Sequence, residues 1–171
     1  MPFFRPDWVL DTYSALSPEL LRAQGVRLLL SDLDFTLAPK TQAEPDEEVR
    51  GWIERMQRSG VQVMILSNNR RTRRVEEFCA ELGIPDEGHA RKPLPHGYRR
   101  AMQRAGAARE ETAMLGDKLL TDLLGAHLSA LPVFLVEPRG GARTPWQKVL
   151  HAAQEPFKRM ALHDLRQNGK K

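Results

Sequence analysis

The chain has 171 residues, 41% of them apolar and 28% charged, which suits one globular domain and excludes an intrinsically disordered chain or two full domains. Its net charge of +4 comes from the segment after residue 144, which has six Lys and Arg against two Asp and Glu, so the first 144 residues are balanced. A nucleic-acid-binding module usually carries positive charge through its fold, so nucleic acid is not an expected partner. No run reaches the roughly 18 apolar residues of a membrane span, and Arg5 and Asp7 interrupt the start where a signal peptide is apolar, so we expect a cytoplasmic protein.

The first predicted pair of elements is a strand followed by a helix. Residues 26–31 form a nearly continuous apolar run, with the length and composition of a buried parallel strand. From residue 45 to 59, apolar residues recur at helical spacing, acidic residues occupy the first turn, and Gly60 supplies a stop. The strand therefore ends just before Asp32, at the edge of a sheet.

The same order recurs along the chain. Residues 61–66 predict a second buried strand, and a helix with an apolar stripe from Val75 to Leu82 follows it. A loop is expected over residues 84–95. The remaining predicted elements are a helix around 98–105, a strand at 112–115, a helix from about 119 to 128 and a strand at 133–136.

This alternation predicts an α/β, Rossmann-like three-layer fold, in which helices cover both faces of a mostly parallel central sheet. Ligands of such sheets bind beyond the carboxyl ends of the strands. We assign residues 1–139 to this domain, including a helical lead-in at the N-terminus. Residues 140–171 are expected to form a basic helical C-terminal extension that packs on the domain.

Two acids follow the first predicted strand. Because side chains alternate along an extended chain, Asp32 and Asp34 are expected to face one ligand together. One carboxylate can attack phosphorus as a nucleophile, while the other protonates the leaving oxygen and later takes a proton from water. Solvated turns also contain such pairs, so the partners of these acids decide the interpretation.

Phosphate-binding groups are expected at the next strand end and in the loop beyond it. Ser67 and Asn68 follow the second strand at a helix start, where a hydroxyl and free N–H groups can hold phosphoryl oxygens. The same residues could simply cap the helix. Lys92 follows in the loop, where an ammonium group can neutralise charge on a phosphoryl group in the transition state.

A third strand end carries acids suited to a metal. Asp117 follows Gly116, and Asp122 lies five residues further on. Carboxylate oxygens are hard ligands, so the pattern favours Mg²⁺. Zinc is not expected, because the one cysteine, Cys79, and the five histidines show no ligand-like spacing.

These groups occur in a fixed order: Asp-x-Asp-x-Thr at 32–36, Ser-Asn at 67–68, Lys-Pro at 92–93 and Gly-Asp-x-x-x-x-Asp at 116–122. In this order and placement the chain resembles the haloacid dehalogenase-like (HAD) phosphatase superfamily over about residues 26–136. The resemblance implies a HAD-like hydrolase that removes phosphate from monoesters with Mg²⁺, through an aspartyl-phosphate intermediate.

More narrowly, residues 116–126 and the lead-in around 26–37 look like the small YqeG-type subclass IIIA phosphatases, which are related to phosphatidylglycerophosphate phosphatases. The resemblance implies the following roles: Asp32 as nucleophile, Asp34 as general acid and base, Ser67, Asn68 and Lys92 around the phosphate, Asp32, the carbonyl of Asp34 and Asp117 on Mg²⁺, and Asp122 behind the metal. Phe35 departs from the small or polar residue expected there, which bears on packing or access.

The gaps between these motifs are too short for a cap domain. Only about twenty residues separate Thr36 from the second strand, and the segment from Ser67 to Lys92 is also short. A capless site implies an open mouth and a substrate held with little enclosure, such as a macromolecule, a small phosphate ester or a phospholipid head group.

Two basic features admit more than one interpretation. One or two of the arginines at the second helix start are hypothesised to contact a second phosphate or an acidic group of the substrate, or else all four only raise solubility; they are Arg70, Arg71, Arg73 and Arg74. The amphipathic pattern from Trp146 to Ala161 favours docking on the domain over peripheral contact with an anionic membrane.

Two rival functions also use parts of this pattern. A receiver-type signalling domain accepts a phosphoryl group on an Asp beside Mg²⁺ and Lys, but its acceptor is not expected in the first core strand with another Asp two residues later. A non-catalytic adaptor would use the basic residues to bind RNA or a membrane, and its RNA binding would be sensitive to salt.

Overall fold

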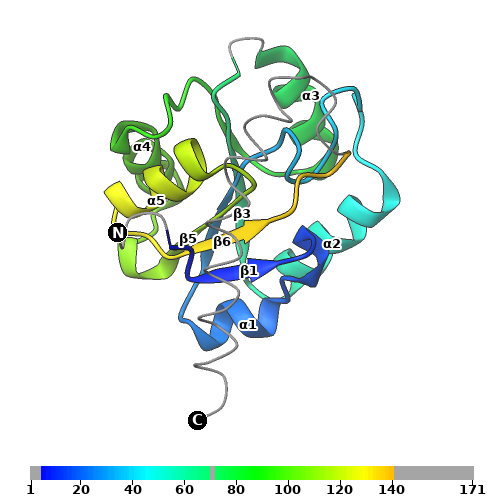
Figure 1. Cartoon of the computed structure of the whole chain (residues 1–171). Helices are drawn as coiled ribbons and strands as arrows, with labels where there is room; N and C mark the ends of the chain where they lie inside the picture. The colour runs from blue at the N-terminus through cyan, green and yellow to red at the C-terminus, as the bar shows by residue number, and fades with distance from the viewer. Residues whose placement is uncertain (1–4, 70–71, 141–171) are drawn as a thin grey trace.

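The protein contains a six-stranded parallel sheet with helices on both faces (Figure 1). The computed structural model describes residues 5–69 and 72–140. The strand order is β1-β6-β5-β2-β3-β4. After β2, the chain adds β3 and β4 on one side of β2 and then β5 and β6 on the other side. The predicted α/β three-layer fold is confirmed.

The elements alternate as expected. The strands are β1 (Trp8–Leu10), β2 (Leu28–Ser31), β3 (Gln62–Leu66), β4 (Asp86–Glu87), β5 (Thr112–Gly116) and β6 (Val133–Val136). The α-helices are α1 (Pro18–Ala23), α2 (Glu47–Arg58), α3 (Thr72–Leu82), α4 (Pro95–Ala105) and α5 (Leu124–Leu128). Short turns of helix lie at η2 (Tyr13–Ala15), η3 (Arg109–Glu111) and η4 (Leu119–Leu123).

Alternating side chains of each strand divide the apolar interior into two cores. On β2, Leu29 belongs to the core beneath α1, α2 and α3, whereas Leu28 and Leu30 belong to the core beneath α4 and α5. A strand covered on both faces has no solvent side, which explains its continuous apolar sequence. Burying both faces leaves the ends of the strands as the place where polar side chains can gather.

Helix α2 illustrates why the predicted boundaries are close to the observed ones. Asp46 caps its start, since the carboxylate accepts a hydrogen bond from the N–H of Val49 at 3.0 Å. Gly60 lies just past its end with φ of +78°, a conformation that glycine adopts without steric cost. Between them, Trp52 is buried and its indole N–H donates to the carbonyl of Leu16 at 2.9 Å.

The structure adds two short strands that the sequence pattern missed. Strand β1 pairs with β6 at one edge, where the rings of Trp8 and Phe134 stack with centroids 4.5 Å apart. Strand β4 lies within the loop expected over residues 84–95, and its Glu87 carbonyl accepts a hydrogen bond from the N–H of Ser67 at 3.0 Å. It thereby fixes the end of β3, where a functional residue was expected.

The described part of the domain has no cap. Residues 32–46 form the loop between β2 and α2, and the described residues from 67 to 94 hold only α3, β4 and connecting loops. In residues 5–69 and 72–140, no helix is long and apolar enough to cross a bilayer. The C-terminal extension lies outside the described residues, so its helical form, its packing and the boundary at residue 139 stay predictions.

The sole cysteine provides a test of the core. Cys79 on α3 is 2% exposed, and burial raises the pKa of its thiol to about 12. Because the thiolate is the reactive form, we expect the native protein to resist 5,5′-dithiobis(2-nitrobenzoic acid) at pH 8 and to react fully in denaturant. Absorbance at the thionitrobenzoate band measures both. Rapid reaction of the native protein would contradict the burial of Cys79 in the core.

Candidate active site

The polar residues of the site follow the three central strands. Residues Asp32, Ser67 and Asp117 come directly after β2, β3 and β5. The strands are in register, because Ser31 pairs with both Ile65 and Leu115. Their carboxyl ends therefore meet at one edge, at the point where the strand order reverses.

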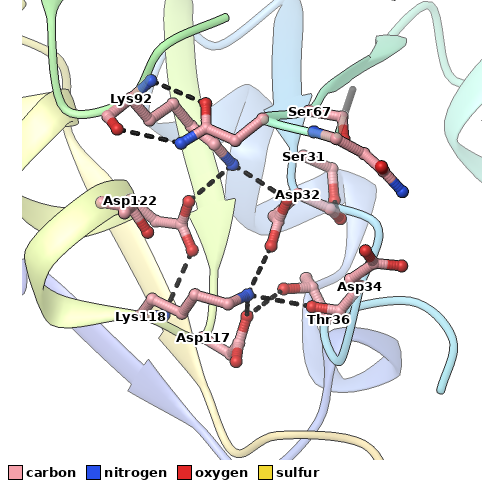
Figure 2. Close-up of polar contacts among 12 residues, drawn as sticks. Ser31, Asp32, Asp34, Thr36, Ser67, Lys92, Asp117, Lys118 and Asp122 are labelled. Carbon is pink, nitrogen blue, oxygen red and sulfur yellow. Dashed lines mark hydrogen bonds and ion pairs between the residues drawn. The ribbon is translucent and has the colours of Figure 1, made fainter. Parts of the chain in front are cut away.

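Asp32 lies between two ammonium groups (Figure 2). Its Oδ1 accepts from Lys92 Nζ at 2.9 Å and its Oδ2 from Lys118 Nζ at 2.7 Å. Burial favours the neutral acid, but the charges of Lys118 and Lys92 outweigh it and hold the pKa of Asp32 well below its usual range. Asp32 is therefore anionic at neutral pH, as a carboxylate nucleophile must be.

Lys92 is fixed at both ends. Its side chain is 2% exposed, and its Nζ also donates to Asp122 Oδ1 at 2.7 Å. Its backbone is held by Asn68, whose Nδ2 donates to the Lys92 carbonyl at 2.9 Å and whose Oδ1 accepts from the Lys92 N–H at 2.7 Å. Burial opposes the charge, but Asp122 and Asp32 raise the pKa of Lys92 above its ordinary value, so it stays cationic.

The hydrogen bonds of Asn68 alter one expectation. Both polar ends of its side chain bind the Lys92 backbone, so the side chain positions the lysine and is not turned to a phosphate. Ser67 is buried, and its Oγ accepts from the N–H of Asn69 at 3.0 Å, which leaves its hydroxyl hydrogen to be donated. At this strand end the Ser67 hydroxyl, and not the Asn68 side chain, is the side-chain donor available to a ligand.

Three oxygens surround the ammonium of Lys118. They are Asp32 Oδ2 at 2.7 Å, Asp117 Oδ1 at 2.7 Å and the backbone carbonyl of Asp34 at 3.0 Å. Thr36 braces the second of these, since its hydroxyl donates to Asp117 Oδ1 at 2.9 Å. Burial raises the pKa of Asp117 above its ordinary value and so do the nearby carboxylates of Asp32 and Asp122, while Lys118 opposes them.

Asp122 supports the site from behind. Its side chain is fully buried; Oδ1 accepts from Lys92 Nζ and Oδ2 accepts from the backbone N–H of Lys118 at 3.1 Å. Gly116 is needed beside it, because a Cβ there would lie 2.4 Å from the Asp122 Cβ. The predicted helix over 119–128 begins as the π-helical turn η4, which closes on the Lys118 carbonyl. Such turns often occur at functional sites.

Asp34 does not face the site as an extended chain would place it. The strand ends at Ser31, and Phe35 at φ +70° opens a turn in which the Leu37 N–H donates to the Leu33 carbonyl. Only the backbone carbonyl of Asp34 points to Lys118, while its carboxylate is turned away (Figure 2). The expectation that both acidic side chains face one ligand is therefore wrong for the observed side-chain conformation.

The Asp34 carboxylate pairs instead with Arg74 of α3. Arg74 Nη1 donates to Asp34 Oδ1 at 2.6 Å, and its other nitrogens donate to the carbonyls of Pro39 and Gln42 at 2.8 to 3.1 Å. Arg74 thus ties the loop after β2 to α3. Arg73 is 89% exposed and pairs with Glu77 one turn along the helix. Arg70 and Arg71 lie outside the described residues.

The fold thus brings together Asp32, Lys92, Asp117 and Asp122, with Ser67 at the adjoining strand end. Sequence reasoning missed Lys118, which follows Asp117 directly and makes three of the polar contacts of the site. It also gave no role to Thr36, although Thr36 belongs to the first motif. Lys118 could have been found from its place next to the predicted metal ligand Asp117, because clustered carboxylates need a positive charge from a side chain or a metal ion.

The donors fit a hard divalent cation. Asp32, Asp117 and Asp122 each offer a carboxylate oxygen, and these three atoms lie within 4.8 Å of one another. The Lys118 ammonium marks a position where a cation touches two carboxylates and one backbone carbonyl. Such oxygen ligands suit Mg²⁺.

Replacing Arg74 tests its part in holding this loop. We expect Arg74→Met to lower the free energy of unfolding by about 1–3 kcal/mol, because the Asp34 carboxylate and two carbonyls lose their donors. Amide exchange should also accelerate across residues 34–42. Arg73→Met is the matched control and should leave the free energy of unfolding nearly unchanged, since its pair with Glu77 is exposed. Equal effects of the two substitutions would contradict this role.

Comparison with known proteins agrees with the geometry. Residues 5–129 match the family model of the haloacid dehalogenase-like hydrolases. "Probable phosphatase YqeG" of Bacillus subtilis (strain 168) is 35% identical over 136 residues, which cover 80% of this chain and 78% of that protein.

Solved structures share the fold at lower identity. A HAD superfamily (subfamily III A) hydrolase from Legionella pneumophila has a TM-score of 0.52 at 19% identity, covering 90% of this chain and 95% of that one. The 3-deoxy-D-manno-octulosonate 8-phosphate phosphatase from Yersinia pestis has a TM-score of 0.53 at 20% identity, covering 82% and 89%. The predicted resemblance to YqeG-type phosphatases is confirmed, and the chain belongs to the haloacid dehalogenase-like hydrolase family.

Proposed function

We propose that this chain hydrolyses phosphate monoesters with Mg²⁺, through a phosphoryl group carried on Asp32. The observation that carries the proposal is the position of Asp32, an ionised carboxylate held between Lys92 and Lys118 at the carboxyl ends of the central strands. A carboxylate nucleophile must approach a phosphate that bears the same sign of charge. The Lys92 ammonium, buried against Asp32, offsets part of that repulsion.

The remaining residues take roles around the phosphoryl group. We assign Lys92 and the Ser67 hydroxyl to its oxygens, because both are buried beside Asp32 on adjoining loops. Asn68 keeps Lys92 in place through its backbone. Asp32, the Asp34 carbonyl and Asp117 would hold Mg²⁺, which when bound screens the charge of the phosphoryl oxygens. Asp122 orients Lys92 and the backbone at Lys118.

The reaction then takes two displacements. In the first, an Asp32 oxygen forms a bond to phosphorus, the ester P–O bond breaks, and Asp34 gives its proton to the departing alkoxide. In the second, water attacks the same phosphorus and passes a proton to Asp34, and the bond from phosphorus to Asp32 breaks. The ion pair with Arg74 holds Asp34 as a carboxylate, so Asp34 must leave Arg74 and take up a proton from water before the first displacement.

The proposal extends to the class of substrate. The fold has no cap in its described part, and Leu94 and Leu120 are 55% and 52% exposed, each two residues beyond a lysine of the site. Exposed leucines near the reacting groups suit a phosphate ester with an apolar part, and a phospholipid head group such as phosphatidylglycerophosphate at a membrane surface is our preferred candidate. A panel of phosphate esters, presented with and without lipid vesicles, would rank this against sugar and nucleotide phosphates.

Asparagine at position 32 tests the nucleophile. We expect Asp32→Asn to lower kcat for p-nitrophenyl phosphate by roughly a thousandfold or more, because the amide cannot form the phosphoenzyme. Release of p-nitrophenolate measures the rate. EDTA should abolish turnover and added Mg²⁺ should restore it. Asp11→Asn at an exposed position is the matched control. Undiminished turnover by Asp32→Asn, or a phosphorylated wild type that never turns over, would contradict the proposal.

The two displacements can be separated at Asp34. With p-nitrophenyl phosphate the leaving group needs little protonation, so Asp34→Asn should slow the second displacement more than the first. The variant should therefore accumulate phosphoenzyme that intact mass spectrometry detects and hydroxylamine removes. If Asp34→Asn hydrolyses substrate slowly without accumulating any phosphoenzyme, Asp34 is not the base of the second step.

A further inference from the structure

The ammonium group of Lys118 contacts oxygens that could coordinate a metal ion. Its Nζ lies 2.7 Å from Asp32 Oδ2, 2.7 Å from Asp117 Oδ1 and 3.0 Å from the Asp34 carbonyl. These three oxygens belong to the residues that the proposed function assigns to Mg²⁺. Figure 2 shows the ammonium reaching in among them from the loop that follows β5.

An ammonium and a divalent ion cannot share these oxygens. Mg²⁺ binds oxygens at about 2.0–2.1 Å. An ion bound to these three oxygens would therefore overlap the position of the Lys118 nitrogen. Two cations at that separation in a buried site would also repel each other strongly. Binding of the metal therefore requires the Lys118 side chain to leave.

The surroundings of Lys118 allow it to leave, whereas those of Lys92 do not. The Lys118 side chain is 29% exposed, against 2% for Lys92. Its backbone N–H is anchored to Asp122 Oδ2, so the movement is confined to the side chain. The centroid of the Phe35 ring lies 5.8 Å from Lys118 Nζ, so the ring can keep a cation-π contact with the ammonium after it moves. Lys92, buried and held at its backbone by Asn68, stays in place.

We propose that Lys118 is a tethered competitor of the metal, which neutralises Asp32 and Asp117 when no divalent ion is bound and is displaced when one binds. The inference rests on the proposed function for the identity of the metal ligands. It makes Lys118 a determinant of metal affinity. Every metal ion that binds must first replace three contacts of one ammonium group, so the protein binds Mg²⁺ more weakly than its oxygens alone would.

Calorimetric titration of the full chain with MgCl₂ tests the competition without any substrate. We expect Lys118→Met to bind Mg²⁺ roughly tenfold or more tightly than the wild type, since the competing charge is gone. In EDTA, the midpoint of thermal unfolding of Lys118→Met should be lower than that of the wild type. Added Mg²⁺ should raise the midpoint of the variant more steeply than that of the wild type. Lys40→Met, which removes the same charge from an exposed loop position, is the control and should bind like the wild type.

The outcomes separate the two proposals. Equal affinity of wild type and Lys118→Met would overturn the competition while leaving the metal site intact. Absence of Mg²⁺ binding in all three proteins would overturn both.

A second measurement uses the wild type, in case the variant folds poorly. Brief acylation with an amine-reactive ester, read by peptide mass spectrometry, should label Lys118 several-fold faster with Mg²⁺ present, because the displaced ammonium enters solvent. Labelling of Lys40 should not change. A Lys118 labelling rate that is independent of Mg²⁺, in a protein that binds the ion, would overturn the proposal.

Discussion

The balance of charge at the carboxyl ends of β2 and β5 is the constraint on which the site depends. Three buried carboxylates, from Asp32, Asp117 and Asp122, face the two ammonium groups of Lys92 and Lys118. Removing either ammonium would leave buried negative charge uncompensated, which is far more costly than losing an exposed pair. The site is therefore a single electrostatic unit, and the surrounding fold serves to hold its members within hydrogen-bond distance.

The layered fold could be predicted because its interior imposes a readable pattern. Strands buried on both faces need unbroken apolar runs, and helices covering them need an apolar stripe, so β2, β3, β5 and β6 and the helices between them were all expected from the sequence. Strands β1 and β4 have three and two residues, too few to show any periodicity. They exist because neighbouring strands offer free backbone groups, which is tertiary information.

The site was predictable to the level of strand ends but not to the level of side-chain direction. Asp32, Ser67 and Asp117 each follow a central strand, so their convergence follows from the parallel topology. The positions of Arg74 and of the Lys118 ammonium depend instead on long side chains with many rotamers, whose partners come from distant segments. A sequence pattern gives the charge of such residues but not the atom that they contact.

The turn at Phe35 directs the backbone carbonyl and the carboxylate of Asp34 to different partners. A continued strand would have placed the Asp34 side chain alongside that of Asp32, whereas the turn directs its carbonyl to Lys118 and its carboxylate to Arg74. A positive φ at a residue other than glycine costs on the order of 1–3 kcal/mol. Hydrogen bonds from the Phe35 N–H to the Ala38 carbonyl and from the Arg139 N–H to the Phe35 carbonyl help to offset that cost. The carbonyl is thereby fixed by the backbone, while the carboxylate stays on a rotatable side chain, which the proposed role of Asp34 as a proton carrier requires.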